Sequence, residues 1–221
     1  MFFAQNIMTP IEGLGYGYLY NWYAASHSNF APNGWSLPSK TDFDTLVTYL
    51  GGSTIAGGKL KEASLNYWTA PNTGATNESG FTALPCGGRG IATGDFFGMY
   101  LQYLFWSITE IGSSVYYMNI YYNYAGANVS TTSNKGTGYG VRLIKDSTTL
   151  SDGETSTMTD EDGNVYDTIC IGTQEWTVQN WKCTKLNDGT PLTKVTSNTT
   201  WATASTGDLY YCAYDNDESN V

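Results

Sequence analysis

The chain has 221 residues, a hydrophobic fraction of 41% and a charged fraction of only 14%, which suits one large domain or two small ones with an ordinary core. Its formal net charge is −10, so we expect no nucleic acid partner and no attraction to anionic lipid. No apolar run of about 18 residues is present, which predicts no membrane insertion. Polarity comes instead from threonine, serine, asparagine and 18 tyrosines, a composition typical of secreted, virion and fibrous β-rich proteins.

The first part of the chain predicts an arm and a strand. Residues 1–13 form the arm, in which Pro10 excludes a continuous central strand. Residues 15–25 read GYGYLYNWYAA, so that aromatic and small side chains alternate. This alternation predicts a strand.

Two short helices are expected next. Ser39 suits an N-cap, and Asp42 places a carboxylate near the positive end of the helix. The apolar side chains that follow have the i, i+3, i+4, i+7 spacing of one helix face, namely Phe43, Leu46, Val47 and Leu50. Gly51 and Gly52 end this helix, and residues 56–63 suit a second, shorter one.

Beyond Tyr67 the pattern predicts strands and loops, and the most informative stretch is YYMNIYYNY over residues 116–124. Alternate side chains of a strand point to opposite faces. One face would carry Tyr117, Asn119, Tyr121 and Asn123, and the other Tyr116, Met118, Ile120, Tyr122 and Tyr124. One face must pack inward, and the other would expose rigid rings and adaptable amides, as antibody loops do. The alternative interpretation is aromatic packing across a two-sided sheet.

The last third of the chain predicts a linker followed by strands. Residues 147–156 contain no aromatic side chain and suit a linker. In residues 157–221, turn sequences at residues 162–164 and at Gly172-Thr173 separate three strand-like stretches, which predicts a hairpin and a further strand. A segment this short buries too little surface to stand alone, so we expect it to pack on the preceding domain.

Long motifs in both parts resemble the Fibrobacter succinogenes major paralogous domain, a bacterial and phage family. In residues 14–146 they are LGYGYLYNWYAA, GWSLPSKTDFDTLVTYLGG, AGGKLKE, PNTGATNESGFTALP, FWSITE and GYGVRLIKD, and in residues 157–221 they are TMTDEDGNVYDTICIGTQEWTVQNWKCTKLNDGTPL and YYCAYDNDESNV. The resemblance implies an α+β fold. It comprises a C-type-lectin-like domain over residues 14–146, with two short helices and many short antiparallel strands, and a β-rich segment over residues 157–221.

The two blocks stand in reverse order. In the family, the block that resembles residues 157–221 comes first and leads directly into the LYNWYAA motif. We therefore expect this segment to dock beside residues 16–23. The residues expected at that contact are Tyr16, Tyr18, Tyr20, Trp176, Trp181 and Trp201. Either a permuted unit closes on itself, or each segment completes the next copy of the chain by strand addition. We expect the second arrangement, a head-to-tail array whose partners are other copies of the chain.

The sequence offers little for catalysis, so no enzymatic activity and no catalytic residue are expected. A relative of this fold with known chemistry, the formylglycine-generating enzyme, uses a reactive cysteine pair, whereas Cys86 is the only cysteine in residues 14–146. A reactive thiol needs a neighbour that lowers its pKa, and no histidine is adjacent. His27, the only histidine, lies in a Ser/Asn-rich stretch and suits a surface position.

We expect no metal and no cofactor. The oxygen-rich stretches at residues 160–164 and 215–218 lack the ligand spacing and terminal glutamate of a calcium loop, so they are interpreted as turns. The four cysteines have no metal-binding spacing. A disulfide from Cys170 to Cys183 or to Cys212 stays open, because a sequence does not establish connectivity.

These features lead to two hypotheses. The first is a non-enzymatic extracellular structural and adhesive protein that assembles head to tail. The second is a phage tail or surface receptor-binding protein, diversified by a retroelement, in which Ile108 stands where the family usually has serine. Both place the protein outside the cell, at a cell surface or on a virion, with a surface glycan or protein as ligand. The residues expected to bind it are Tyr100, Gln102, Tyr103, Tyr116, Tyr117, Asn119, Tyr121, Tyr122, Asn123 and Tyr124.

Overall fold

The computed structural model describes residues 15–221, so the arm expected over residues 1–13 lies outside the described residues. The helices in this part are α1 (Trp22–Ala25), α2 (Lys40–Tyr49), α3 (Ala56–Leu60) and α4 (Asn198–Trp201), with 3-10 turns η1 (Tyr214–Asn216) and η2 (Glu218–Asn220). The strands are β1 (Leu19–Tyr20), β2 (Trp35–Ser36), β3 (Cys86–Arg89), β4 (Phe96–Met99), β5 (Gln102–Ile111), β6 (Ser114–Tyr121), β7 (Ala127–Thr132), β8 (Ile144–Lys145), β9 (Thr155–Thr159), β10 (Val165–Ile171), β11 (Gln174–Thr177), β12 (Thr193–Lys194) and β13 (Tyr210–Cys212). The fold is mostly β with a few short helices, which is compatible with the expected α+β class.

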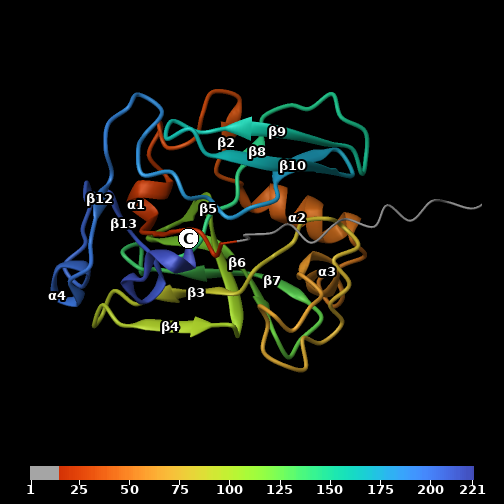
Figure 1. The fold of residues 1–221 in the computed structure, drawn as a ribbon, viewed down its shortest axis with the longest axis horizontal. Coiled ribbons are helices and arrows are strands. Elements are labelled where there is room, and N and C mark those ends of the chain that lie inside the picture. The colour runs from red at the N-terminus through yellow and green to blue at the C-terminus, as the bar shows by residue number, and fades with distance from the viewer. Residues whose placement is uncertain (1–14) are drawn as a thin grey trace, which may run out of the picture.

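The strands form three sheets, and two of them are shared between the body (residues 15–146) and the C-terminal segment (residues 147–221). The first sheet has the order β1–β13–β12, and the second has the order β2–β8–β11–β10–β9. Only the third sheet, β4–β3–β5–β6–β7, belongs to the body alone. Figure 1 shows β9 and β10 of the segment lying along β2 and β8 of the body. The segment therefore packs on the body, as expected, and has no sheet of its own.

Local chemistry explains where the helices begin. Ser39 and Asp42 form a capping box at α2, in which each side chain accepts a hydrogen bond from the backbone amide of the other. Both helices expected from the sequence are thus present, although α3 ends earlier than residue 63. The expected hairpin and third strand of the segment are also confirmed, as β9, β10 and β11.

The prediction of a continuous strand over residues 15–25 was wrong. The strand ends at Tyr20, and α1 begins two residues later because the side chain of Asn21 accepts a hydrogen bond from the Ala24 amide at 3.0 Å. Ser197 caps α4 in the same way, through the Thr200 amide. A helix of four residues needs little more than an N-cap. It is also too short to show a helical spacing of apolar residues, so the sequence of residues 15–25 still resembles a strand.

The third sheet lies between two hydrophobic cores. On the α2 side, Met118 packs in a cluster that includes Trp176. On the opposite side, Trp106 packs in a cluster that includes Tyr20 and Trp181. Because Trp176 and Trp181 come from the C-terminal segment, both cores contain side chains from both parts of the chain.

The C-terminal segment closes on its own body. Strand β13 pairs antiparallel with β1, which places Tyr211 opposite Tyr20, and the Tyr16 amide donates to the Asn220 carbonyl at 2.7 Å. Val221 consequently lies against Gly15. The expected docking position beside residues 16–23 is confirmed.

The chain's own segment occupies the position that we expected to receive the segment of a neighbouring copy, and completion of a neighbour stays a prediction. The geometry explains how the chain closes on itself. Strands β8 and β9 stand three positions apart in one sheet, about 14 Å at the usual strand spacing. The connection from Lys145 to Thr155 can span about 30 Å when extended. Closure within the chain therefore needs no second molecule and avoids the entropy cost of association.

Candidate functional site

Exposed aromatic side chains gather at one end of the third sheet. There the turn of residues 122–125 follows β6 and lies beside the turn that precedes β5, since the Tyr122 amide donates to the Leu101 carbonyl at 2.9 Å. Tyr100 is 48% exposed, Leu101 40% and Tyr124 40%. We refer to these three side chains, together with the half-buried Tyr122, as the aromatic rim.

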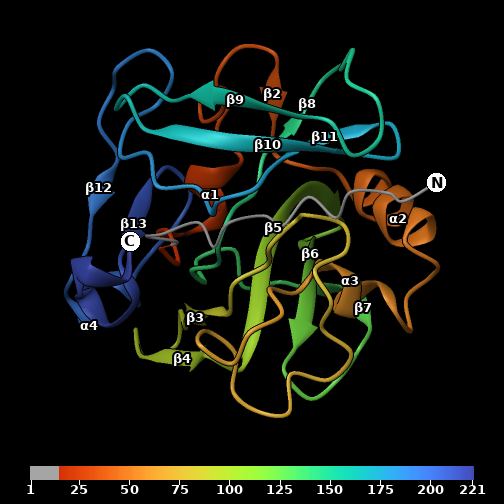
Figure 2. The same ribbon diagram turned by 45° about the vertical axis from the view of Figure 1, so that its right-hand side comes forward.

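A buried lysine fixes the turn of residues 122–125, which carries two side chains of the aromatic rim, to a neighbouring loop. The ammonium group of Lys61 donates to the carbonyls of Thr73 at 2.8 Å, Tyr121 at 3.1 Å and Tyr124 at 3.1 Å. Figure 2 shows these loops, α3 and the end of β6 at the same end of the molecule. Burial lowers the pKa of Lys61 to about 8, and the three carbonyls compensate for the water that the charge has lost.

The predicted ladder on β6 has the register that turns Tyr117, Asn119 and Tyr121 away from α2, while Met118 packs in the core. This face is half-buried rather than open. Asn119 is only 4% exposed, and its side-chain amide donates to the Ser130 hydroxyl at 3.0 Å. The face is a hydrogen-bonded sheet surface on which Tyr117 and Tyr121 are half-exposed. This supports the packing interpretation, and ligand binding at this face stays a prediction.

The other predicted binding residues differ in exposure. Tyr103 is fully buried, and its hydroxyl donates to Asn180 at 2.9 Å, so its assignment as a ligand contact was wrong. The pairing explains the error, because Tyr103 stands opposite Ile120 on the core side of the sheet. Partly or fully exposed positions are taken by Gln102, Tyr116 and Asn123.

The residues expected at an assembly interface lie inside the chain's own junction. Tyr16, Tyr18, Tyr20, Trp176, Trp181 and Trp201 are all buried. The Tyr20 hydroxyl donates to the Cys183 carbonyl at 2.8 Å, and Trp181 stacks on Tyr166 with ring centroids 4.7 Å apart. Burial raises the pKa of Tyr20 well above its usual value. These side chains join the segment to the body and are not free to bind anything else.

Two buried arginines, the only ones in the chain, also bind the segment. Arg142 donates to Asn180 Oδ1 and to the Thr177 carbonyl, each at 2.7 Å. Arg89 donates to the Val195 carbonyl at 2.6 Å. Sequence reasoning missed both. For Arg142 a signal was available, because it is a single cation inside the apolar run GYGVRLI. A buried segment tolerates an arginine only if the N–H donors of the guanidinium are hydrogen-bonded.

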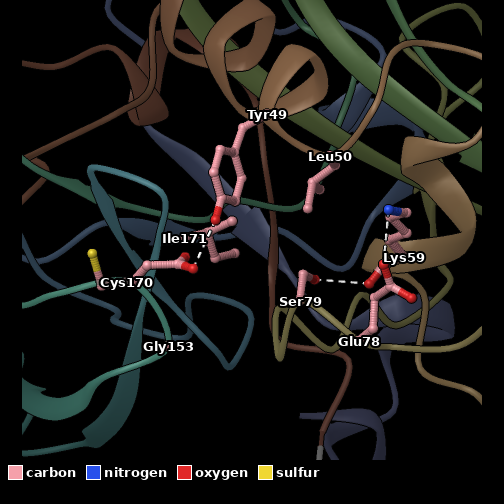
Figure 3. Close-up of a pocket in the computed structure, with 9 residues that line it drawn as sticks. Tyr49, Leu50, Lys59, Glu78, Ser79, Gly153, Cys170 and Ile171 are labelled. Atoms are coloured by element: carbon pink, nitrogen blue, oxygen red, sulfur yellow. Dashed lines mark hydrogen bonds and ion pairs between the residues drawn. The ribbon is translucent and has the colours of Figure 1, made fainter.

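A pocket between the body and the segment is a second candidate site, which no motif of the sequence indicated. Its volume is about 380 Å³, and its walls include Tyr49, Lys59 and Glu78 from the body and Asp152 and Ile171 from the segment. Figure 3 shows Tyr49 and Ile171 on one side and Lys59 and Glu78 on the other. Lys59 pairs with Glu78 at 2.8 Å, and the Tyr49 hydroxyl donates to Asp152 at 2.7 Å. The pocket therefore combines ordered polar groups with an aromatic ring.

The four cysteines are free and buried, so neither disulfide that the sequence left open is formed. Burial raises the pKa values of Cys86, Cys183 and Cys212 to about 12. These thiols therefore stay protonated at neutral pH, whereas a nucleophilic cysteine needs a lowered pKa. His27 lies in a smaller pocket of about 290 Å³, where its Nδ1 accepts a hydrogen bond from the Asn29 amide at 3.2 Å.

Within residues 15–221, the histidine, cysteine and acidic side chains form no group of three close enough to hold a metal ion. In the same range, no helix has the length and apolar character needed to cross a membrane.

The fold and its exposed features describe a mostly β domain with aromatic loops at one end and a polar pocket at the junction of its two parts. Residues 4–145 match the family model of the Fibrobacter succinogenes major domain. The match covers more than half of the chain, so the chain belongs to this family. Residues 146–221 lie outside the match. No curated protein and no solved structure matches the chain.

Proposed function

We propose that the chain is a non-enzymatic binding module that acts outside the cell, at a cell surface or on a virion, and holds its ligand on the aromatic rim. The observation that carries this proposal is the exposure of Tyr100, Leu101 and Tyr124 on adjacent turns. Tyrosine rings with polar tips contribute strongly to interfaces, and loops on a rigid scaffold are the usual place for binding residues. The ligand is a glycan or a protein of a cell surface.

The geometry around Lys61 supports this proposal. Its three hydrogen bonds tie the turn of residues 122–125 to the loop that contains Thr73. Turns that are already ordered lose little conformational entropy when a ligand binds, so more of the contact energy becomes affinity. The part of the rim on this turn is thus suited to bind a ligand without rearrangement of the backbone.

The fold that we propose for the body is the C-type-lectin-like fold, which the family resemblance implies. In support, α2 packs against β5 and β6 while the long β5–β6 hairpin leads to loops at one end. The calcium-dependent sugar site of such lectins is not part of the proposal, because their Glu-Pro-Asn, Gln-Pro-Asp and Trp-Asn-Asp motifs are absent from the sequence.

A receptor-binding role on a phage particle is the second candidate, and the cysteines favour it over a secreted adhesin. Secreted domains of this size commonly carry disulfides, whereas proteins that fold in a reducing cytosol keep free thiols. All four cysteines here are free and buried. A virion protein folds in the cytosol of its host before release, which is consistent with that state. Both candidates use the same rim.

Binding of labelled protein to intact bacteria from a panel of species tests the proposal. The double variant Tyr100→Ser/Tyr124→Ser is expected to bind at least about tenfold more weakly than the wild type, the usual loss for an interface hot spot. Val165→Ser is the matched control, because Val165 is 62% exposed and lies on the segment. Equal binding by the double variant and the control would exclude the rim, and failure of the wild type to bind any cell or isolated surface glycan would exclude the function.

A further inference from the structure

We infer that the pocket between α2, α3 and the C-terminal segment is a binding site for one unit of a neutral saccharide, separate from the aromatic rim. Its volume of about 380 Å³ lies within the usual range for small-ligand sites, about 300–1,000 Å³. The walls come from five separate stretches of the sequence, three in the body and two in the C-terminal segment. The site therefore exists only when the C-terminal segment is docked.

The aromatic wall is held in place before any ligand arrives. The Tyr49 side chain is 52% exposed, yet its hydroxyl donates to Asp152 Oδ2 at 2.7 Å. The other oxygen of Asp152 accepts from the Gly172 amide at 2.7 Å. Gly172 has a φ of +65°, and a Cβ built there would come within 3.0 Å of the Tyr49 ring. One face of the ring is thus supported by backbone, and the exposed part presents a flat apolar surface to the C–H groups of a sugar ring.

The opposite wall offers a donor and an acceptor side by side. Lys59 and Glu78 pair at 2.8 Å, with side chains 31% and 54% exposed. After the ion pair forms, the ammonium group of Lys59 still has N–H donors to offer, and the carboxylate of Glu78 still has lone pairs that can accept. A hydroxyl both donates and accepts, so neighbouring hydroxyls of a sugar can bond to the two groups at once. The Ser79 hydroxyl, fixed on the Lys59 carbonyl at 2.8 Å, adds a further polar atom.

Charge selects against acidic ligands. The pocket has two carboxylates, Glu78 and Asp152, against one ammonium, Lys59, and the whole chain carries a formal charge of −10. An anionic sugar or a phosphate would be repelled. A neutral sugar is not repelled, and its C–H groups can pack on the Tyr49 ring, a contact that a simple cation would not make.

Titration of uniformly ¹⁵N-labelled protein with single neutral sugars tests this inference. The probes are glucose, galactose, mannose, N-acetylglucosamine and a β-1,4-linked glucose disaccharide, each up to tens of millimolar. We expect at least one probe to shift the amide signals of Tyr49, Gly153 and Ile171 while the signals of the aromatic rim stay in place. Because the walls belong to both parts of the chain, the same probe should also raise the melting temperature.

Variants decide whether the pocket is responsible. Tyr49→Ala should weaken binding by about tenfold or more, and Tyr49→Phe should retain part of it because the ring remains. Glu78→Gln should weaken binding by about tenfold, whereas Glu161→Gln, at an exposed acid on the same segment as Asp152, should not. Unchanged affinity in Tyr49→Ala and Glu78→Gln would overturn the assignment.

Two other results would also overturn the inference. One is the absence of any shift at these amides with every sugar of the panel. The other is a response of the same amides to a lysine-rich peptide but not to sugars, which would make the site a receptor for cationic chains. Loss of cell binding in the rim variants leaves the pocket untouched, so failure of this inference and failure of the proposed function can be told apart.

Discussion

Two tyrosine-rich stretches of this chain have different fates. The first, around β1, carries Tyr18 and Tyr20, and both are buried beneath the C-terminal segment. The second, along β6, carries Tyr117 and Tyr121 on a face that stays half-exposed. Both stretches alternate aromatic and small or polar residues, so their own sequences do not distinguish them. What separates them is whether another part of the chain covers the strand, and for β1 that cover lies about 190 residues away in the sequence.

The largest expected effect on this comparison comes from alkaline pH. Burial raises the pKa values of Cys86 and Cys212 from 9.0 to about 12, and it raises that of Tyr20 as well. In the unfolded chain these groups lose their protons near pH 9 to 10. The unfolded state therefore binds fewer protons, and stability that is fully present below pH 9 falls as the pH rises toward 12.

We expect the buried junction to open in this range, as followed by circular dichroism and tyrosine absorbance. Lys61 acts in the opposite direction, because its pKa is lowered to about 8, so its buried charge costs less as the pH rises toward 10.5. The gain in stability from this one lysine is smaller than the combined loss from the buried tyrosines and thiols. Stability that increases steadily from pH 9 to pH 12 would show that the junction tyrosines are not buried.

The next largest effect is expected for Arg142→Met. The variant leaves buried acceptors without donors, among them Asn180 Oδ1 and the Thr177 carbonyl. Each unsatisfied buried group costs about 1–3 kcal/mol, so we expect a loss of about 4 kcal/mol in the free energy of unfolding, measured by denaturant titration. Lys182→Met, at a partly exposed lysine of the same segment, is the control and should change little. A loss near that of the control would mean that water replaces the guanidinium.

Trp181→Ala should cost about 3–5 kcal/mol, the usual range for a large aromatic side chain removed from a core. Trp181 is 1% exposed and stacks on Tyr166, beneath the β1 tyrosines. Leu65→Ala, at a residue that is 62% exposed, should be nearly neutral in the same denaturant titration. If Trp181→Ala unfolds at the same denaturant concentration as Leu65→Ala and the wild type, the packing of Trp181 does not stabilise the segment on the body.

The smallest effect separates the two tyrosine stretches most directly. Tyr20→Phe removes a buried hydroxyl that donates to the Cys183 carbonyl at 2.8 Å, and we expect a loss of about 1–2 kcal/mol. Tyr121→Phe removes a hydroxyl at the half-exposed edge of β6, and it should change the melting temperature by less than one degree. Equal losses for the two substitutions would contradict the difference between the buried and the open stretch.

Local signals in the sequence carried the predictions that succeeded. The cap at Ser39 and the apolar stripe after it defined α2, and the turns at residues 162–164 and Gly172 defined the strands of the segment. The docking beside residues 16–23 was also predictable, because the resemblance specified which blocks belong together. In each case the information lay in neighbouring residues or in a motif.

The features that failed or were missed depend on distant contacts. Tyr103 was taken as a ligand contact because its strand partner was unknown. The role of Arg89 and Arg142 depends on carbonyls that lie 35 or more residues away. The pocket beside Tyr49 is built across the junction, so no single stretch contains its pattern. The closure of the segment on its own body depends on the distance between β8 and β9, which alternation does not encode.

The position of Val221 against Gly15 has a mechanical consequence. The Tyr16–Asn220 hydrogen bond lies next to this contact, and the antiparallel β1–β13 pair follows it beyond the 3-10 turns η1 and η2. A pull applied at Gly15 and Val221 would load the Tyr16–Asn220 hydrogen bond first and the β1–β13 pair afterwards, so the contacts would break one after another. Unzipping geometry yields at low force, so a tether attached at these two residues would peel β13 from β1 and lengthen the molecule while the third sheet stayed folded.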